Sequence, residues 1–163
     1  MRYFAYGSNM SVLRLRQRVP SAQVLGLAVL HGHRLMFHKA GRDGSAKCDA
    51  TVSVRDKDVV HGVLYRMDPA HKSCLDNAEG LGRGYAQKTV EVSLTDGGSA
   101  FAITYYATST NPALKPYSWY LEHVLRGARE NGLPTDYVAE IAATDTIFDP
   151  DPERNRAELA IYI

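Results

Sequence analysis

Two strand-like segments joined by a tight turn limit the possible folds of this chain more than any other pattern in it. Residues 85–94 and 99–108 both have the composition of β-strands. Asp96-Gly-Gly98 lies between them and is a strong hairpin signal, because glycine readily adopts the positive φ that such turns need. Most other strand-like segments are also joined by short turns. The sequence therefore predicts a largely antiparallel sheet.

The rest of the chain alternates further strands with a few helices. Strands are predicted at residues 22–32, 33–38, 50–54 and 59–67, with a polar loop over 39–49 and a hairpin around 55–58. One helix is bracketed by Asp68-Pro69 and Gly80, a second runs from Tyr117 to Asn131-Gly132, and a short tail follows the proline-rich segment 149–152. With no internal repeat or linker, residues 1–163 are expected to form one α+β domain, a curled or barrel-like sheet flanked by helices.

Composition excludes several classes of function. The 163 residues are 45% hydrophobic and 23% charged, as in ordinary globular proteins, and the net charge of +1 without a basic cluster argues against nucleic-acid binding. No apolar stretch is long enough to cross a membrane and the first residues do not resemble a signal peptide, so we expect a cytoplasmic protein. The two cysteines and six histidines show no metal-ligand spacing, so no metal is expected.

The N-terminal segment Arg2-Tyr-Phe-Ala-Tyr-Gly-Ser-Asn-Met10 reads as a short strand that ends in a hydrogen-bonding loop. Gly7 has no Cβ to obstruct a ligand, and Ser8 and Asn9 add side-chain donors, so the loop suits an anionic or carbonyl group. The alternative is structural: Ser8, Asn9 or Ser11 can cap a helix that begins near residue 12. The two interpretations are compatible.

Glu79 is the candidate for proton transfer. It lies in the last turn of the helix that ends at Gly80, where the helix dipole disfavours a carboxylate, and general acid–base chemistry requires a carboxyl group that gains and loses a proton readily. The alternative is an ordinary surface glutamate. Gly80, Gly82 and Gly84 do not form a dinucleotide-binding loop, because such a loop follows a strand and opens a helix, which is the reverse of the order here.

Three blocks together resemble the γ-glutamylcyclotransferase family. They are Tyr3-Phe-Ala-Tyr-Gly-Ser-Asn-Met10, then Leu75-Asp-Asn-Ala-Glu79-Gly80 with Gly84-Tyr85, and finally Gly127-Ala-Arg-Glu-Asn-Gly-Leu-Pro134. The resemblance implies a mixed, mostly antiparallel small β-barrel flanked by helices. It also implies an enzyme, often dimeric, that cyclises a γ-glutamyl group to 5-oxoproline without a cofactor. Glu79 would be the catalytic acid/base, and the substrate would contact Tyr3, Phe4, Ala5, Tyr6, Gly7, Ser8, Asn9, Tyr85 and Tyr120.

The residues suit this chemistry independently of the resemblance. The substrate's own α-amine is the nucleophile and ring closure gains from proximity, so the reaction needs only a base, oxyanion donors and an acid. Tyr85 and Tyr120 are either pocket residues or ordinary core tyrosines, and Arg83 is a weaker candidate for binding a substrate carboxylate.

Two alternative functions stay open: a cyclotransferase for γ-glutamylamines or a γ-glutamyl-protected natural product, and a non-catalytic binding module. The 41–47 segment and the tail after Pro152 have no role in the family pattern, and either can reshape the leaving-group side.

Overall fold

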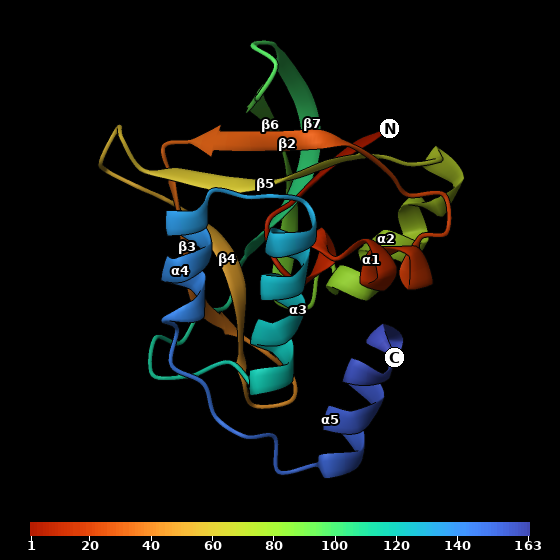
Figure 1. The fold of residues 1–163 in the computed structure, drawn as a ribbon, viewed down its shortest axis with the longest axis vertical. Coiled ribbons are helices and arrows are strands. Elements are labelled where there is room, and N and C mark those ends of the chain that lie inside the picture. Colours follow the sequence, from red (N-terminus) through yellow and green to blue (C-terminus); the bar gives the residue numbers. More distant parts are fainter.

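A computed structural model describes all 163 residues (Figure 1). The strands are β1 (Arg2–Ala5), β2 (Gln23–His31), β3 (His33–Ala40), β4 (Ala46–Val52), β5 (Val59–Arg66), β6 (Tyr85–Leu94) and β7 (Ser99–Ala107). The α-helices are α1 (Val12–Arg18), α2 (Lys72–Glu79), α3 (Ser118–Glu130), α4 (Thr135–Ala142) and α5 (Pro152–Leu159). Short 3-10 helices are η1 (Ser8–Met10), η2 (Pro69–His71) and η3 (Ala160–Tyr162).

Five strands close into a barrel in the order β1-β5-β2-β6-β7. Every pairing is antiparallel except the one that closes the barrel, where β1 and β7 run parallel and Tyr3 lies opposite Ile103. The β6–β7 hairpin is confirmed, with its turn closed by the Leu94 N–H on the Gly98 carbonyl at 2.8 Å. The predicted mixed, mostly antiparallel barrel flanked by helices is therefore the observed fold.

The predicted hairpin around residues 55–58 is wrong. β5 is paired on one side with β1 and on the other with β2, so neither of its edges is free for β4. β4 instead pairs with β3 in a separate two-stranded sheet, in which Ala46 lies opposite Ala40. The predicted polar loop over 39–49 is correspondingly shorter, since β3 continues to Ala40 and β4 begins at Ala46.

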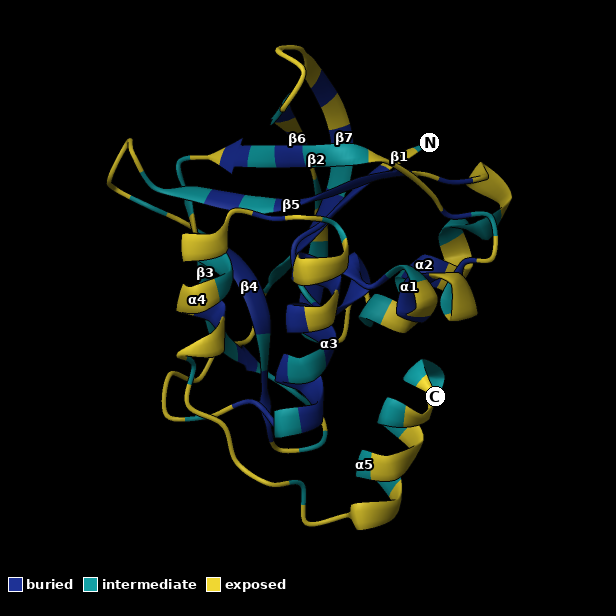
Figure 2. Ribbon diagram, in the orientation of Figure 1, coloured by how far each residue is buried: buried dark blue, intermediate teal, exposed yellow.

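The helices cover one end and one side of the barrel. α4 packs against α3, which occupies the centre of the view in Figure 1, and α5 lies below α1. α3 buries eight of its thirteen residues, whereas α5 buries none. Figure 2 accordingly shows dark blue segments on α3 and only teal and yellow on α5. None of these helices combines the length and the apolar character that crossing a membrane requires.

The predicted helix boundaries are confirmed at both ends of α3 and at the end of α2. Gly80 ends α2 in the left-handed conformation, with φ +75°, and its N–H bonds the Asp76 and Asn77 carbonyls. Asp68 accepts the Ala70 N–H, but the turn it caps is η2, which leads into α2. Two helices, α4 and α5, lie outside the predicted set. The C-terminal tail is thus largely helical.

Candidate active site

The N-terminal loop is formed by η1, which connects β1 to α1. Ser11 caps α1 by accepting the Arg14 N–H, so the capping interpretation of this segment holds alongside the loop interpretation. A Cβ on Gly7 would lie 3.0 Å from the Cβ of Cys48 and 3.5 Å from the Tyr120 hydroxyl oxygen. Close packing against Cys48 of β4, and not a positive φ, therefore favours glycine at position 7.

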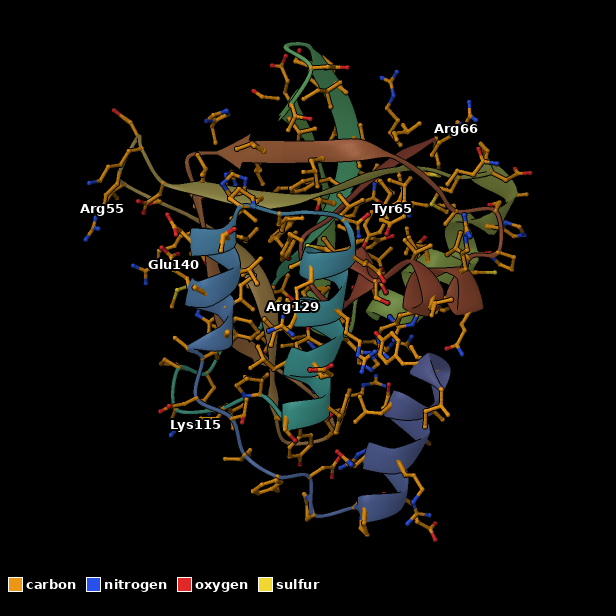
Figure 3. All side chains as sticks on the ribbon, in the orientation of Figure 1. Arg55, Tyr65, Arg66, Lys115, Arg129 and Glu140 are labelled. Atoms are coloured by element: carbon orange, nitrogen blue, oxygen red, sulfur yellow. The ribbon has the colours of Figure 1, made fainter.

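The Gly127–Pro134 block holds this loop in place from α3. A Cβ on Gly127 would lie 2.4 Å from the Ser11 nitrogen and 2.5 Å from the Met10 carbonyl carbon, so only glycine lets α3 approach so closely. Asn131 donates its side-chain amide to the Met10 carbonyl at 3.0 Å, and Tyr65 of β5 (Figure 3) donates its hydroxyl to the same oxygen at 2.7 Å. The loop is thus held by a side chain about 120 residues further along the chain.

Glu79 lies against this loop at the C-terminal end of α2. Its Oε1 atom accepts hydrogen bonds from the Tyr3 hydroxyl at 2.7 Å and from the Asn9 side-chain amide at 2.6 Å. Asn9 is itself oriented by Arg18, whose guanidinium donates to Asn9 Oδ1 at 2.9 Å. The second oxygen, Oε2, has no hydrogen-bond partner in the protein. Burial and the nearby Glu79 carboxylate raise the pKa of Tyr3 well above its usual value, so Tyr3 remains a donor at any physiological pH.

Glu79 and the loop enclose a small pocket of about 30 Å³, here called the inner pocket. Its lining consists of a loop segment, Glu79 and a ring of tyrosines: Tyr3, Tyr6, Gly7, Ser8, Asn9, Cys48, Glu79, Tyr85, Tyr105 and Tyr120. The structure therefore brings together all of the expected site residues except Phe4 and Ala5. Those two lie in the core, Phe4 completely buried and Ala5 1% exposed, and neither lines the pocket.

Most of the tyrosine hydroxyls in the inner pocket are already hydrogen-bonded to the protein. Tyr6 donates to the Tyr105 carbonyl and Tyr85 donates to the Cys48 carbonyl, each at 2.5 Å. The Tyr120 hydroxyl accepts the Cys48 N–H at 3.0 Å and so can still donate its own hydrogen. Tyr85 therefore forms the pocket wall with its ring, while Tyr120 also offers a donor.

Cys48 and Tyr105 line the inner pocket although the sequence does not mark them as site residues. They come from β4 and β7, whose approach to the loop depends on tertiary packing, so no local signal identifies them. Burial raises the pKa of the Cys48 thiol to about 12, so at neutral pH it is not a nucleophile.

Two polar groups of the loop have no hydrogen-bond partner in the protein: the Gly7 N–H has no acceptor, and the Ser8 hydroxyl makes no hydrogen bond.

A larger cavity of about 320 Å³, here called the vestibule, adjoins the inner pocket and shares Ser8, Glu79, Tyr85 and Tyr120 with it. Its charged lining comprises six cations and three carboxylates: Arg14, Arg18, Lys39, Arg42, Lys47 and Arg83 against Asp43, Glu79 and Glu158. Asp43 pairs with Lys47 at 2.7 Å, and Glu158 pairs with Arg14 at 2.5 Å. The 41–47 segment and the C-terminal tail thus both contribute to the vestibule wall.

No group of three or more histidine, cysteine, aspartate or glutamate side chains is arranged to hold a metal ion. The groups that the site offers for chemistry are one carboxylate, the unpaired loop donors and the vestibule cations. This set can exchange a proton with a bound amine and hydrogen-bond to a carbonyl or carboxylate oxygen.

Comparison with known proteins identifies the family of this chain. Residues 59–141 match the AIG2-like family. The γ-glutamylcyclotransferase of Mus musculus is 33% identical over 147 residues, which cover 88% of this chain and 78% of the mouse protein. That of Homo sapiens is 32% identical over 147 residues, with the same coverage. A solved structure of a γ-glutamyl cyclotransferase superposes with a TM-score of 0.83 at 28% identity, covering 90% of this chain and 89% of the other.

These similarities extend over most of the chain, and the fold agrees over 90% of it. The loop after β1, the carboxylate at the end of α2 and the α3 segment that fixes the loop are one connected structure. The chain therefore belongs to the γ-glutamylcyclotransferase family of enzymes.

Proposed function

We propose that this protein converts a γ-glutamyl-amino acid to 5-oxoproline and the free amino acid, with Glu79 as the general acid/base. The observation that carries the proposal is the setting of Glu79. Its Oε1 is held by Tyr3 and Asn9, its Oε2 has no hydrogen-bond partner in the protein, and Glu79 lines both the inner pocket and the vestibule. A carboxylate fixed in this way presents one oxygen to the substrate in a single orientation.

The reaction begins when Glu79 removes a proton from the substrate's α-ammonium group. The freed amine attacks the γ-carbonyl carbon and closes a five-membered ring, which places the negative charge on the former carbonyl oxygen. Glu79 then donates this proton to the leaving nitrogen, the carbon–nitrogen bond breaks and the carbonyl re-forms. The ring nitrogen still carries one extra proton, which passes by way of Glu79 to the released amine, so the products are 5-oxoproline and an amino acid with an ammonium group. Glu79 thus ends each cycle ionised, as it began, and neither water nor a protein nucleophile is consumed.

The loop supplies donors for the substrate's oxygens. The Gly7 N–H, the Ser8 hydroxyl and the Tyr120 hydroxyl are available beside Glu79. Donors held in place before the reaction stabilise developing negative charge without reorganising, and in many enzymes this effect lowers the activation barrier more than any other. The same groups also suit the substrate's α-carboxylate.

The vestibule favours an amino acid over a simple amine as the leaving group. Lys39, Arg42 and Arg83 line it and have no carboxylate partner. A leaving amino acid brings a carboxylate into this space, whereas the leaving part of a γ-glutamylamine brings no anion. The Coulomb attraction therefore favours γ-glutamyl-amino acids.

The test is to incubate the purified protein, without added metal, with a panel of γ-glutamyl-amino acids and γ-glutamylamines and to measure 5-oxoproline. The Glu79→Gln variant keeps an oxygen that accepts from Tyr3 and Asn9 but loses proton transfer, so we expect kcat to fall by about a hundredfold or more. Glu140→Gln, on the exposed face of α4 (Figure 3), is the matched control and keeps full activity.

The outcomes separate the alternatives. A Glu79→Gln variant as active as the parent refutes the role of Glu79, and better turnover of the amines favours the γ-glutamylamine alternative. No product from any substrate favours a binding module on the same fold. The single domain over residues 1–163, the cytoplasmic location and a homodimer stay predictions from the sequence.

A further inference from the structure

The vestibule holds more positive charge than one carboxylate requires. Arg14 and Lys47 are paired with Glu158 and Asp43, but Arg18, Lys39, Arg42 and Arg83 form no ion pair. Arg18 is used to orient Asn9. Three cations therefore remain without a carboxylate on the path that a leaving group takes out of the inner pocket. These unpaired cations give the vestibule a local excess of positive charge, although the net charge of the whole chain is only +1.

Lys39 is the innermost of the three. It is only 6% exposed, its ammonium lies 4.7 Å from the centre of the Tyr85 ring, and it makes no hydrogen bond to the protein. Lysine is rarely so buried unless it is paired, because an unpaired buried charge is costly. Burial lowers the pKa of Lys39, and the nearby Lys47 and Arg42 charges lower it further, partly offset by Asp43. An anion bound from the vestibule would relieve this cost.

The backbone beside Lys39 is shaped to leave its ammonium group room. A Cβ on Gly84 would lie 3.0 Å from both Cε and Nζ of Lys39. Gly84 also has φ +110°, a conformation that other residues rarely adopt. The segment between Glu79 and Tyr85 thus passes directly beside the Lys39 ammonium group.

Arg42 and Arg83 form a second group of cations, at the outer rim of the vestibule. Both are exposed and both line the vestibule, one from the 41–45 turn between β3 and β4 and the other from the loop after α2. Arg83 makes only a long contact of 3.4 Å with the Asn77 carbonyl, and Arg42 makes none. Guanidinium groups bind carboxylates with two parallel hydrogen bonds, so this pair suits a second carboxylate at the rim.

We propose that the vestibule is a subsite for a dicarboxylic leaving amino acid, in which Lys39 binds one carboxylate and Arg42 and Arg83 bind the other. This proposal rests on the proposed cyclotransferase function and specifies its substrate class as γ-glutamyl conjugates of acidic amino acids. A leaving amino acid with a neutral side chain would leave Arg42 and Arg83 without an anionic partner.

The test compares two substrates of nearly equal size and shape that differ by one negative charge, L-γ-glutamyl-L-glutamate and L-γ-glutamyl-L-glutamine. We expect kcat/KM to be about tenfold higher for the glutamate conjugate at low ionic strength, which corresponds to about 1.4 kcal/mol. The preference should shrink as salt is added, because exposed charges are screened over about 10 Å at 0.1 M salt.

Variants assign the preference to particular cations. Arg42→Gln/Arg83→Gln should bring the ratio of the two kcat/KM values close to one, mainly by raising KM for the glutamate conjugate. The charge-matched control Arg55→Gln/Arg129→Gln changes two exposed arginines outside the vestibule (Figure 3) and should leave the ratio unchanged. Lys39→Met should raise KM for both substrates, since both retain the α-carboxylate.

The results separate this proposal from the one on which it rests. Equal kcat/KM for the two conjugates in the parent enzyme overturns the dicarboxylate subsite while leaving the cyclotransferase intact. A preference that persists in Arg42→Gln/Arg83→Gln, or that the control variant also loses, overturns the assignment to the vestibule. Failure to form 5-oxoproline from either conjugate and from every member of the wider panel refutes the cyclotransferase function itself.

Discussion

At the scale of single residues, the arrangement around Glu79 depends on two neutral donors that share one of its oxygens. Tyr3 comes from β1 and Asn9 from η1, so β1 and the loop act on the carboxylate together. A hydrogen bond to a charged group contributes about 1.5–3 kcal/mol. Loss of either donor should therefore affect the orientation and the proton transfer of Glu79 more than substrate binding.

Tyr3→Phe tests this role with the smallest change. The ring remains in the core and only the hydroxyl donor is lost, so kcat should fall by about tenfold to a hundredfold with KM nearly unchanged. Steady-state release of 5-oxoproline measures both parameters. Tyr106→Phe removes a hydroxyl outside both cavities and serves as the control. Equal kcat for the Tyr3 variant and the parent would show that this hydrogen bond has no catalytic role.

At the scale of secondary-structure elements, the contact between α3 and η1 holds the N-terminal loop in place. Gly127 is in the middle of α3, where alanine is normally about 1 kcal/mol more favourable than glycine. Here the added Cβ would lie 2.4 Å from the Ser11 nitrogen and 2.5 Å from the Met10 carbonyl carbon. Alanine at this position is therefore expected to destabilise the protein instead of stabilising it.

We expect Gly127→Ala to lower the free energy of unfolding by about 1–3 kcal/mol, the usual cost of overpacking. Denaturant unfolding followed by the fluorescence of Trp119, the single tryptophan, measures this change. Gly98→Ala is the control, because a Cβ there would meet no atom closer than 3.7 Å. A Gly127 variant more stable than the parent would refute the close approach of α3 to the loop.

The elements also show what sequence can and cannot predict. Gly80, Asp96-Gly-Gly98 and Asn131-Gly132 mark the ends of two helices and the hairpin turn through local backbone chemistry, and those boundaries are confirmed. Strand pairing, in contrast, is not determined by local sequence. The residues of β4 and β5 indicate two strands, but they do not indicate that β1 and β2 pair with the two edges of β5.

The two helices outside the predicted set differ in their sequence signals. Tyr137, Val138 and Ile141 have helical spacing and follow Pro134-Thr135, so a periodicity signal for α4 is present. Asp151-Pro152 is the same start signal as Asp68-Pro69, but α5 has no apolar face to confirm it. In the site, local sequence does not mark Cys48, Tyr105 and Lys39, because strand pairing and packing bring them to the loop and helix end that the family motifs identify.

At the scale of the whole molecule, the C-terminal segment docks beside the active site through a partly buried ionic network. Glu158 of α5 binds Arg14 at 2.5 Å and His123 at 3.2 Å, and Tyr162 bonds His123 and Ser11. Burial opposes ionisation of Glu158, but the His123 hydrogen bond and the Arg14 charge outweigh it and lower its pKa to about 2.

Because the pKa of Glu158 is lower in the folded state than its usual value of 4.5, the network contributes stability above about pH 5. That contribution is lost as the pH falls from about 5 towards 2. Glu158→Gln should lower the unfolding free energy at pH 7 by about 1–3 kcal/mol, with the difference from the parent shrinking in acid. Thermal unfolding at several pH values measures it, and a constant difference from pH 7 to pH 3 would contradict the role assigned to Glu158.

The central proposal is intramolecular ring closure with Glu79 as the proton carrier. The test is turnover of a γ-glutamyl-amino acid in water labelled with a heavy oxygen isotope, followed by mass spectrometry of both products. It shows directly whether the nucleophile is water or the substrate's own amine. We expect equal amounts of free amino acid and 5-oxoproline, with no label in the 5-oxoproline, and loss of both products in Glu79→Gln. Labelled glutamate in place of 5-oxoproline would show that water is the nucleophile and would contradict this mechanism.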